Sequence, residues 1–381
     1  MKKKKIMSKS KKIKIILCGG GTGGHIFPML SIADEIKKQN NKSEILFVGS
    51  KDRMEMKIVP KYNYPIKGLW ISGIKRSSFL LNVIFIGVPF ILKNISLPFK
   101  ILHSLIKSLF ILIQYRPDIV VGFGGYSSGP FLLVASLLGY KTAIQEQNSF
   151  PGYTNRILSK KVNVIFVAFE NLEKYFKNNQ VFNLGNPIRS SIQLNNKSGY
   201  NHFGLERNKK TILVVGGSLG AKSINESILT NLSLIRESSF QLIWQTGSTY
   251  YNVIQSKKLE STNIKILPFI DRMDLAYSVA DVIISRAGAI AISELCVVGK
   301  PLILVPSPNV VDDHQTKNAQ DVLTKNACLV VNDYKAKDIL LKEVINLLND
   351  NNKLLLISSN LKELAKPNAS KNIVNELYNL L

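Results

Sequence analysis

The sequence predicts an α/β protein built from two doubly wound domains. Short apolar runs alternate with stretches of helical periodicity along most of the 381 residues, a pattern typical of a parallel sheet covered by helices on both faces. The alternation lapses into polar and charged residues over 191–210 and then starts again. Each half opens with a strand, a glycine-rich loop and a helix, which indicates that the second half repeats the architecture of the first.

The apolar runs fix where the strands are expected. In the first half they are IKIIL, EILFVG, PDIVVGFGG, KTAIQEQN and VNVIFVAF, and in the second half TILVVGG, FQLIWQTG, NIKILPFI, ADVIISRAG and KPLILVPSP. The expected organisation is a basic tail at 1–12, an N-terminal domain at 13–190, a linker at 191–210, a C-terminal domain at 211–362, and a C-terminal helix at 363–381 that can pack back on the N-terminal domain.

The charge balance favours anionic partners. Lysine and arginine number 50 against 26 acidic residues, a net charge of +24 that suits phosphorylated ligands, nucleic acid or an anionic membrane surface. Compositional drift toward lysine is the plainer explanation for much of it. Cys18, Cys296 and Cys328 stand singly in apolar segments, which indicates neither a disulfide framework nor a thiolate metal site and fits a reducing, cytoplasmic setting.

Residues 78–113 form a long apolar segment interrupted by prolines and lysines. Its longest uninterrupted part is too short to span a bilayer comfortably. Lysines at intervals, as in KILHSLIKSLFIL, predict helices that bury one side in the protein. Either these are ordinary core helices, or their other side rests on a membrane surface.

Glycine-rich loops in both halves indicate phosphate binding. Gly19, Gly21 and Gly24 match the dinucleotide fingerprint, but a dinucleotide binder carries an acid after the next strand, where this chain has Gly49 and Ser50. An oxidoreductase is therefore disfavoured. Glycine lets the backbone approach a ligand closely, and the amides and dipole of the following helix attract an anion.

Two polar side chains beside glycine turns are candidates for chemistry. His25 follows the first loop at a helix start, where an imidazole can act as a general base or can merely pack against the helix. Glu294 lies in a predicted helix after the SRAG turn. Its carboxylate can accept the two hydroxyls of a nucleotide ribose, or can be an ordinary solvated helix acid.

Seven motifs occur in an order that resembles one enzyme family: GGGTGGHIFP, GFGGYSSGP, EQN, GNPIR, GGSLGA, SRAGAIAISE and DDHQTKNA. From about residue 13 to the C-terminus the chain is similar to the MurG-type N-acetylglucosaminyltransferases of peptidoglycan synthesis. The resemblance implies the GT-B fold, with two Rossmann-like doubly wound domains facing across a cleft.

The resemblance also implies an activity and a location. The implied reaction is transfer of N-acetylglucosamine from UDP-N-acetylglucosamine to the C4 hydroxyl of the muramoyl sugar of lipid I, undecaprenyl-pyrophosphoryl-MurNAc-pentapeptide. The product is lipid II, formed with inversion and without a metal or other cofactor. The enzyme would be peripheral at the cytoplasmic face of the inner membrane, on an anionic surface, beside other cell-wall synthesis and division proteins, and would bind no nucleic acid.

Site residues follow from the same resemblance. His25 would be catalytic, and Gly125, Tyr126 and Ser127 would form the acceptor side. The donor would be bound by Thr22, Gly23, Gly24, Asn148, Arg189, Ser218, Ile270, Ala289, Ile290, Ala291, Ile292, Ser293, Glu294 and Gln315. Gln145, Leu219 and His314 depart from residues common in the family, which puts secondary contacts in doubt. Asp312, Asp313 and His314 form no metal site, because no second ligand cluster accompanies them.

Two alternatives stay open from the sequence. Another GT-B transferase acting on a membrane glycolipid would carry similar donor loops, and the sugar in its product would distinguish it. A non-enzymatic, basic polyanion-binding protein would bind in a salt-sensitive manner without donor turnover, but would leave both glycine loops unexplained.

Overall fold

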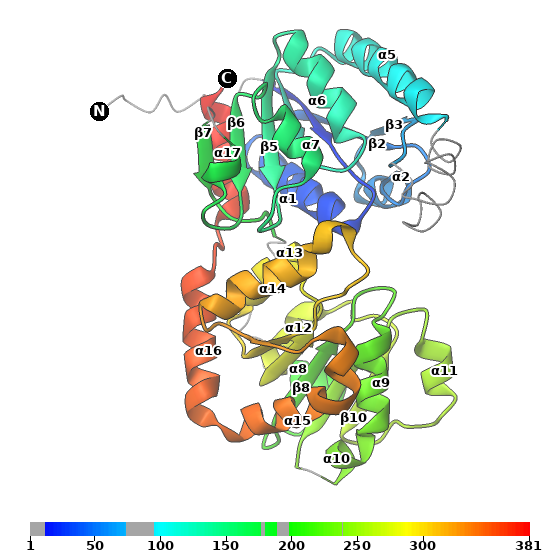
Figure 1. Ribbon diagram of the computed structural model, residues 1–381, viewed down its shortest axis with the longest axis vertical. Helices are drawn as coiled ribbons and strands as arrows, with labels where there is room; N and C mark the ends of the chain where they lie inside the picture. Colours follow the sequence, from blue (N-terminus) through cyan, green and yellow to red (C-terminus); the bar gives the residue numbers. More distant parts are fainter. Residues whose placement is uncertain (1–11, 74–94, 177–179, 189–197, 238) are drawn as a thin grey trace, which may run out of the picture. The chain divides into compact units, whose positions relative to one another are not determined.

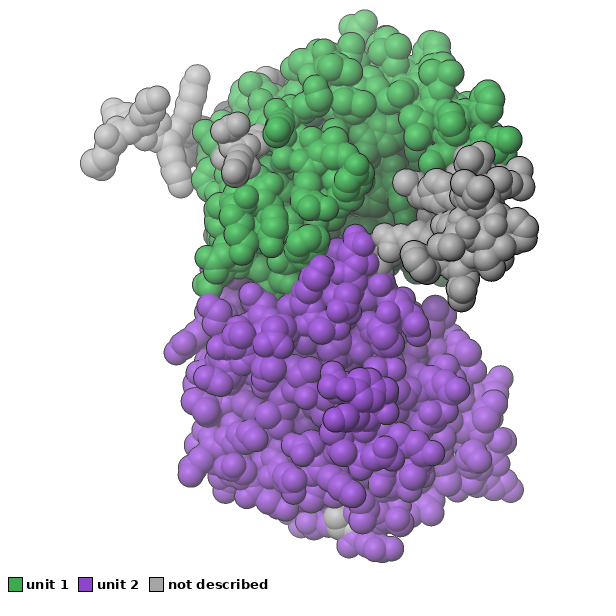
Figure 2. All heavy atoms as spheres, in the orientation of Figure 1, with its two compact units in different colours: residues 1–188, 368–381 green, residues 189–367 purple. Residues whose placement is uncertain are grey.

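The computed structural model describes residues 12–73, 95–176, 180–188, 198–237 and 239–381. The chain divides into two compact units, coloured separately in Figure 2. Unit 1 contains residues 1–188 together with 368–381, and unit 2 contains residues 189–367. Each unit is a parallel sheet with helices, as Figure 1 shows, which confirms the predicted α/β class.

Unit 1 contains a seven-stranded sheet in the order β3-β2-β1-β4-β5-β6-β7, with every neighbouring pair parallel. The strands are β1 (Lys14–Cys18), β2 (Glu44–Ser50), β3 (Ile66–Leu69), β4 (Ile119–Gly122), β5 (Lys141–Glu146), β6 (Val164–Val167) and β7 (Gln180–Asn183). The helices are α1 (Gly23–Gln39), α2 (Glu55–Ile58), η1 (Val59–Tyr62), α5 (Leu97–Tyr115), α6 (Ser128–Leu137), α7 (Tyr153–Leu158), η2 (Glu173–Tyr175) and α17 (Ala369–Asn379).

Unit 2 contains a six-stranded parallel sheet in the order β10-β9-β8-β11-β12-β13. The strands are β8 (Thr211–Val215), β9 (Gln241–Gln245), β10 (Ile264–Leu267), β11 (Val282–Ser285), β12 (Leu302–Leu304) and β13 (Leu329–Val330). The helices are α8 (Ser198–Phe203), α9 (Lys222–Thr230), α10 (Leu232–Arg236), α11 (Tyr251–Gln255), α12 (Met273–Val279), α13 (Ala289–Val298), η3 (Val311–Asp313), α14 (His314–Thr324), η4 (Asp333–Lys335), α15 (Ala336–Asn349) and α16 (Asn351–Leu364).

Both sheets reverse their strand order at one point. In unit 1 the chain runs outward from β1 through β2 and β3, then crosses to β4 on the other side of β1; in unit 2 the same reversal separates β8 from β11. Loops leaving the carboxyl ends of these central strands diverge, and ligands of open α/β sheets bind in the crevice between them. The glycine-rich loops follow these four strands, so the topology brings them to two such crevices, one in each unit.

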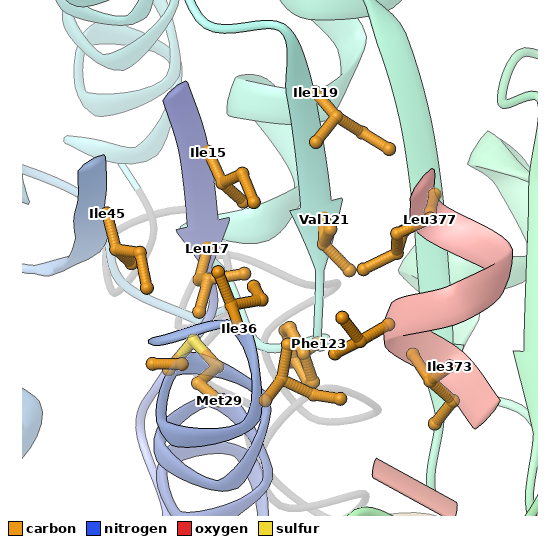
Figure 3. Packing of buried hydrophobic residues seen from close by; sticks show 14 of the residues in the cluster. Ile15, Leu17, Met29, Ile36, Ile45, Ile119, Val121, Phe123, Ile373 and Leu377 are labelled. Carbon is orange, nitrogen blue, oxygen red and sulfur yellow. The ribbon is translucent and has the colours of Figure 1, made fainter. Parts of the chain in front are cut away.

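The C-terminal helix α17 completes the core of unit 1. Ile373 and Leu377 of this helix are fully buried in a cluster with Val121 of β4, Phe123 just beyond it, and Ile36 of α1 (Figure 3). Residues 1–11 of the expected tail lie outside the described residues. Part of the expected linker does too, while α8 within that stretch packs against α12 in unit 2.

Candidate active site

The first glycine loop joins β1 to α1 and makes a tight turn. Gly21 has φ of +89°, a conformation that favours glycine. No side chain of the described residues caps the N-terminus of α1, and its first turn carries no acid. Thr22, Gly23 and Gly24 lie at this end of the helix, and Thr22 and Gly24 are exposed. The dipole and amides of α1 therefore favour an anion here.

His25 is held by the carbonyl of its own loop. Its Nδ1 lies 2.8 Å from the carbonyl oxygen of Gly20 and 3.3 Å from Oγ1 of Thr22. A carbonyl oxygen can only accept, so the short contact requires the proton on Nδ1. That tautomer places the imidazole lone pair on Nε2, the nitrogen that can act as a base. Nε2 faces the second loop, 3.2 Å from the position that a Cβ on Gly124 would occupy.

The second loop, between β4 and α6, packs against the first one backbone to backbone. Gly125 has φ of +81°, and a methyl group there would lie 2.4 Å from the carbonyl oxygen of Gly20. The ring of Tyr126 lies against the backbone of Gly73, yet the residue is 46% exposed. Ser127 is fully buried, and its hydroxyl has no hydrogen-bond partner in the described part of the chain. A ligand at this loop would meet the backbone and the exposed part of Tyr126.

Two buried carboxylates, to which the sequence analysis assigned no role, hold these loops. Glu55 at the start of α2 accepts the amides of Gly21 and Ser50 at 2.9 and 2.8 Å. Glu146 at the end of β5 accepts four hydrogen bonds and orders the loop that contains Asn148. Its donors are the backbone amides of Asn148 and Gly152 and the side-chain amides of Asn148 and Asn155.

Gln145, one of the departures from the family pattern, is buried beside the GNPIR segment. Its side-chain amide lies 3.4 Å from the carbonyl oxygen of Gly185 and 3.3 Å from Oδ1 of Asn186. These contacts tie β5 to the segment that follows β7. Arg189, the cation predicted to face the donor, lies outside the described residues.

The glycine loop of unit 2 is fixed by a glutamine that sequence reasoning missed. Gln245 at the end of β9 donates from Nε2 to the carbonyl of Gly217 at 3.0 Å and accepts the amide of Ile270 at 3.1 Å. Gly217 has φ of +88°, and the carbonyl of Ser218 accepts the amide of Ser248 at 3.0 Å. The side chain of Ile270 is buried, so a nucleotide base at this position would contact the backbone of Ile270 and the neighbouring residues.

Helix α13 starts directly after β11 at the reversal of the second sheet. Gly288 is its N-cap, no described side chain caps it, and its first turn contains no acid. Ala289 and Ile292 are buried, whereas the other four predicted donor contacts on this helix are half-buried: Ile290, Ala291, Ser293 and Glu294. Glu294 lies in the second turn, and the first-turn amides form the expected anion site.

The charged and amide groups around α13 are engaged in the fold. Arg286 of the SRAG turn pairs with Asp333 and donates to Ser223, so its guanidinium ties the turn to η4 and α9. Gln315 at the start of α14 accepts the amide of Ser307 at 2.8 Å through its side-chain oxygen, and its side-chain NH₂ is the group that can donate.

Neither a nucleophilic thiol nor a metal-binding cluster is found in the described residues. Burial raises the pKa of the Cys18 thiol to about 12, so this cysteine at the end of β1 is a neutral, packed side chain. Groups of three or more histidine, cysteine or acidic side chains that could hold an ion do not occur in the described ranges.

Comparison with known proteins assigns the chain to a family. Two family models match, the glycosyltransferase family 28 N-terminal domain over residues 15–167 and the C-terminal domain of the same family over residues 211–374. The chain belongs to glycosyltransferase family 28. This family 28 protein thus carries one family domain in each half, and the predicted family is confirmed.

Two relatives that match over nearly their whole length share one name. The relative from Flavobacterium psychrophilum is 47% identical over 374 residues, 97% of this chain and 98% of its own length. That from Christiangramia forsetii is 46% identical over 373 residues, again 97% and 98%. Both are named UDP-N-acetylglucosamine–N-acetylmuramyl-(pentapeptide) pyrophosphoryl-undecaprenol N-acetylglucosamine transferase.

A solved structure supports the fold. The crystal structure of Acinetobacter baumannii MurG matches with a TM-score of 0.75 at 29% identity, covering 96% of this chain and 99% of that one. The GT-B fold expected for this family 28 chain is thereby confirmed.

Proposed function

We propose that this protein transfers N-acetylglucosamine from UDP-N-acetylglucosamine to the C4 hydroxyl of the muramoyl sugar of lipid I, which forms lipid II. The observation that carries the proposal is the 47% identity to a transferase of this name over nearly the whole of both chains. The glycine loops at both reversals of strand order support it, because they offer backbone amides to two diphosphate-containing substrates.

The donor is assigned to unit 2. The diphosphate meets the N-terminus of α13 and the loop of Ser218, the ribose hydroxyls meet Glu294, and Gln315 donates to the sugar. The other donor contacts predicted from the sequence are Thr22, Gly23, Gly24, Asn148 and Arg189. The amides and Arg189 offset the negative charge that develops on the departing UDP, which is the role a metal ion would otherwise fill.

His25 is proposed as the general base. Its Nε2 takes the proton of the acceptor hydroxyl as that oxygen bonds to the anomeric carbon, from the face opposite UDP. The bond between the anomeric carbon and the diphosphate oxygen breaks, and UDP leaves with the electron pair, so the configuration inverts. The imidazolium keeps its Nδ1 proton on the carbonyl of Gly20. Gly125, Tyr126 and the backbone of Ser127 receive the acceptor.

Glu294→Gln tests the ribose contact. A hydrogen bond to a carboxylate contributes about 1.5–3 kcal/mol, so we expect KM for UDP-N-acetylglucosamine to rise at least about tenfold with little change in kcat. With a donor analogue that lacks the ribose 2′ and 3′ hydroxyls, variant and wild type should perform equally. Glu363→Gln, an exposed acid of α16, is the control. An unchanged KM would remove Glu294 from the donor site.

Helix α5 supports a peripheral membrane location. It is the one helix in the described ranges that is long and apolar enough to cross a membrane by length and composition. One face of the helix packs within unit 1: Ser104 and Ser108 are buried, and Lys107 donates to the carbonyl of Gly68 at 2.7 Å. The opposite face exposes large apolar side chains at helical spacing: Phe99, Leu102, Ile106, Phe110 and Ile113. The part of the predicted segment at 78–94 lies outside the described residues.

A double Phe99→Ser, Phe110→Ser variant tests this face. Each phenylalanine is about two-thirds exposed, at 69% and 66%, and inserting both rings into lipid contributes about 1.5–3 kcal/mol each if fully buried. We expect binding to anionic vesicles to weaken at least about tenfold, and turnover of a short-chain soluble acceptor to stay the same. Leu355→Ser on α16, exposed by 71%, is the matched control. Unchanged vesicle binding would exclude α5 as the membrane contact.

The rival reading is a family 28 transferase that uses another UDP-sugar on a glycolipid. An equimolar mixture of UDP-N-acetylglucosamine, UDP-glucose and UDP-galactose distinguishes the two by the mass of the product. We expect only the N-acetylhexosamine product; a plain hexose in the product would support the rival.

A further inference from the structure

Glu55 is a buried carboxylate between two glycine-containing loops. It is fully buried, and the described residues show no ion pair to it. Both oxygens are used: Oε1 accepts the amide of Ser50 and Oε2 accepts the amide of Gly21. A Cβ on Gly20 would lie 2.1 Å from Oε1, and one on Gly49 would lie 2.5 Å from Cγ, so glycine at these positions makes room for the acid.

One peptide group links this carboxylate to His25. The amide N–H of Gly21 donates to Glu55 at 2.9 Å, and the carbonyl of Gly20, which belongs to the same peptide group, accepts from Nδ1 of His25 at 2.8 Å. N–H and C=O point in opposite directions in a trans peptide, so the acid and the imidazole lie on opposite sides of one polarisable unit. Hydrogen bonds connected in series in this way strengthen one another.

We propose that Glu55 is a positioning residue for His25, which acts through the peptide group between Gly20 and Gly21. Its negative charge draws the N–H of Gly21 and increases the negative charge on the carbonyl oxygen of Gly20. That oxygen then holds the Nδ1 proton of His25 more firmly and stabilises the imidazolium that forms when Nε2 takes a proton. The hydrogen-bonded link between Glu55 and His25 does not depend on the proposed function, whereas its effect on catalysis does.

Other charged groups on the surrounding elements are directed elsewhere or are solvated. Glu146 accepts hydrogen bonds from its own loop and from Asn155 of α7, Lys67 of β3 donates to Gln114, and Arg156 of α7 lies over the ring of Phe150. The remaining charged residues near Glu55 in the chain are exposed: Lys51, Asp52, Arg53, Lys57 and Lys61. Glu55 is the buried carboxylate whose hydrogen bond reaches the peptide group that holds Nδ1 of His25.

Nuclear magnetic resonance of protein labelled in histidine and glycine tests the link directly. The chain has four histidines, and the His25 signal is assigned by its loss in His25→Ala. In the wild type we expect the Nδ1-protonated tautomer at high pH, and an amide signal of Gly21 that moves with the titration of His25 while that of Gly139 does not. The Nε2-protonated tautomer, or a Gly21 amide that ignores the titration, would overturn the proposal without any variant.

Variants then measure the effect. In Glu55→Gln the titration midpoint of His25 should fall by about one pH unit, because the imidazolium loses a stabilising negative charge. The kcat should fall roughly tenfold, as is usual for a group that orients another, and the acidic limb of the pH profile should move to lower pH. Glu55→Asp keeps the charge and should restore the midpoint. A lower kcat with an unmoved midpoint and limb would show a purely structural role and contradict the proposal.

A matched control separates this effect from the loss of any carboxylate. Asp118 accepts the amide of Lys14 at 2.7 Å at the opposite end of β1, so Asp118→Asn should lower stability without moving the midpoint. The two levels of the account fail separately. If the wild type transfers no N-acetylglucosamine but the His25 midpoint falls in Glu55→Gln, the proposed function alone is contradicted. If the wild type transfers the sugar but the midpoint does not fall in the variant, the role of Glu55 alone is contradicted.

Discussion

We expect His25→Ala to lower kcat for transfer by roughly 10²–10⁴-fold, the contribution typical of a general base. Nε2 is the nitrogen left basic by the contact between Nδ1 and Gly20, and alanine supplies no substitute. Because the ring sits beside the loop and adds no charge to the donor contacts, the dissociation constant for UDP-N-acetylglucosamine should stay within about threefold of wild type. Single-turnover kinetics and isothermal titration calorimetry measure the two quantities.

His202→Ala provides the control, because this histidine on α8 is exposed, lies with its ring against Phe203 and should be replaceable at full activity. A His25→Ala enzyme with near wild-type kcat would show that the histidine merely packs at the start of α1. Loss of donor binding in parallel with kcat would show that the loop, and not the base, had been damaged.

Gly125→Ala should strongly destabilise unit 1. The added Cβ would lie 2.4 Å from the carbonyl oxygen of Gly20, and it cannot rotate away, because its position is fixed by the backbone of residue 125. Beyond the cost of a positive φ, we expect overpacking to destabilise the protein by about 1–3 kcal/mol. Transfer should also fall sharply, since the displaced oxygen is the one that holds His25.

Gly139→Ala isolates the close approach of the loops from backbone strain. Its φ of +79° almost equals the +81° of Gly125, but a Cβ there would meet nothing within 4 Å. Alanine at Gly139 should therefore cost only about 1 kcal/mol, and the thermal midpoint of Gly125→Ala should lie roughly 5 °C lower than that of this control. Equal midpoints and equal activities would contradict the packing of the two loops.

The fold was largely predictable because its central strands are buried on both faces. Runs such as IKIIL and TILVV are mostly apolar and coincide, within one residue, with β1 and β8. The strands that the sequence did not reveal are at or near the edges of the sheets and contain polar residues or few residues: β3, β7 and β13. Pairing with a neighbour, which a local pattern does not carry, makes them strands.

The candidate site was predictable where local geometry requires special residues. Gly21, Gly125 and Gly217 adopt positive φ in loops after central strands, so the sequence itself marks these positions with glycine. The roles of Glu55 and Gln245 could not be predicted from the sequence. Glu55 binds a residue that is 34 positions away in the chain, and Gln245 binds one that is 28 positions away. Their importance arises only when tertiary packing buries them against backbone amides and carbonyls.

Departures from the family pattern divide in the same way. Gln145 was a doubtful secondary contact in the sequence, and the structure gives it partners in the segment before Arg189. Leu219 is 70% exposed in the loop of unit 2, so the residue type there is not set by packing.

Mass spectrometry of a short-chain lipid I analogue tests the central claim most directly. The purified protein is incubated with the analogue, UDP-N-acetylglucosamine and EDTA, and the product is analysed for mass and for the configuration of the new linkage. We predict a gain of one N-acetylhexosamine, joined through the C4 hydroxyl of the muramoyl sugar with inversion, at a rate that EDTA does not change. No gain from a folded protein that binds the donor would contradict the acceptor assignment.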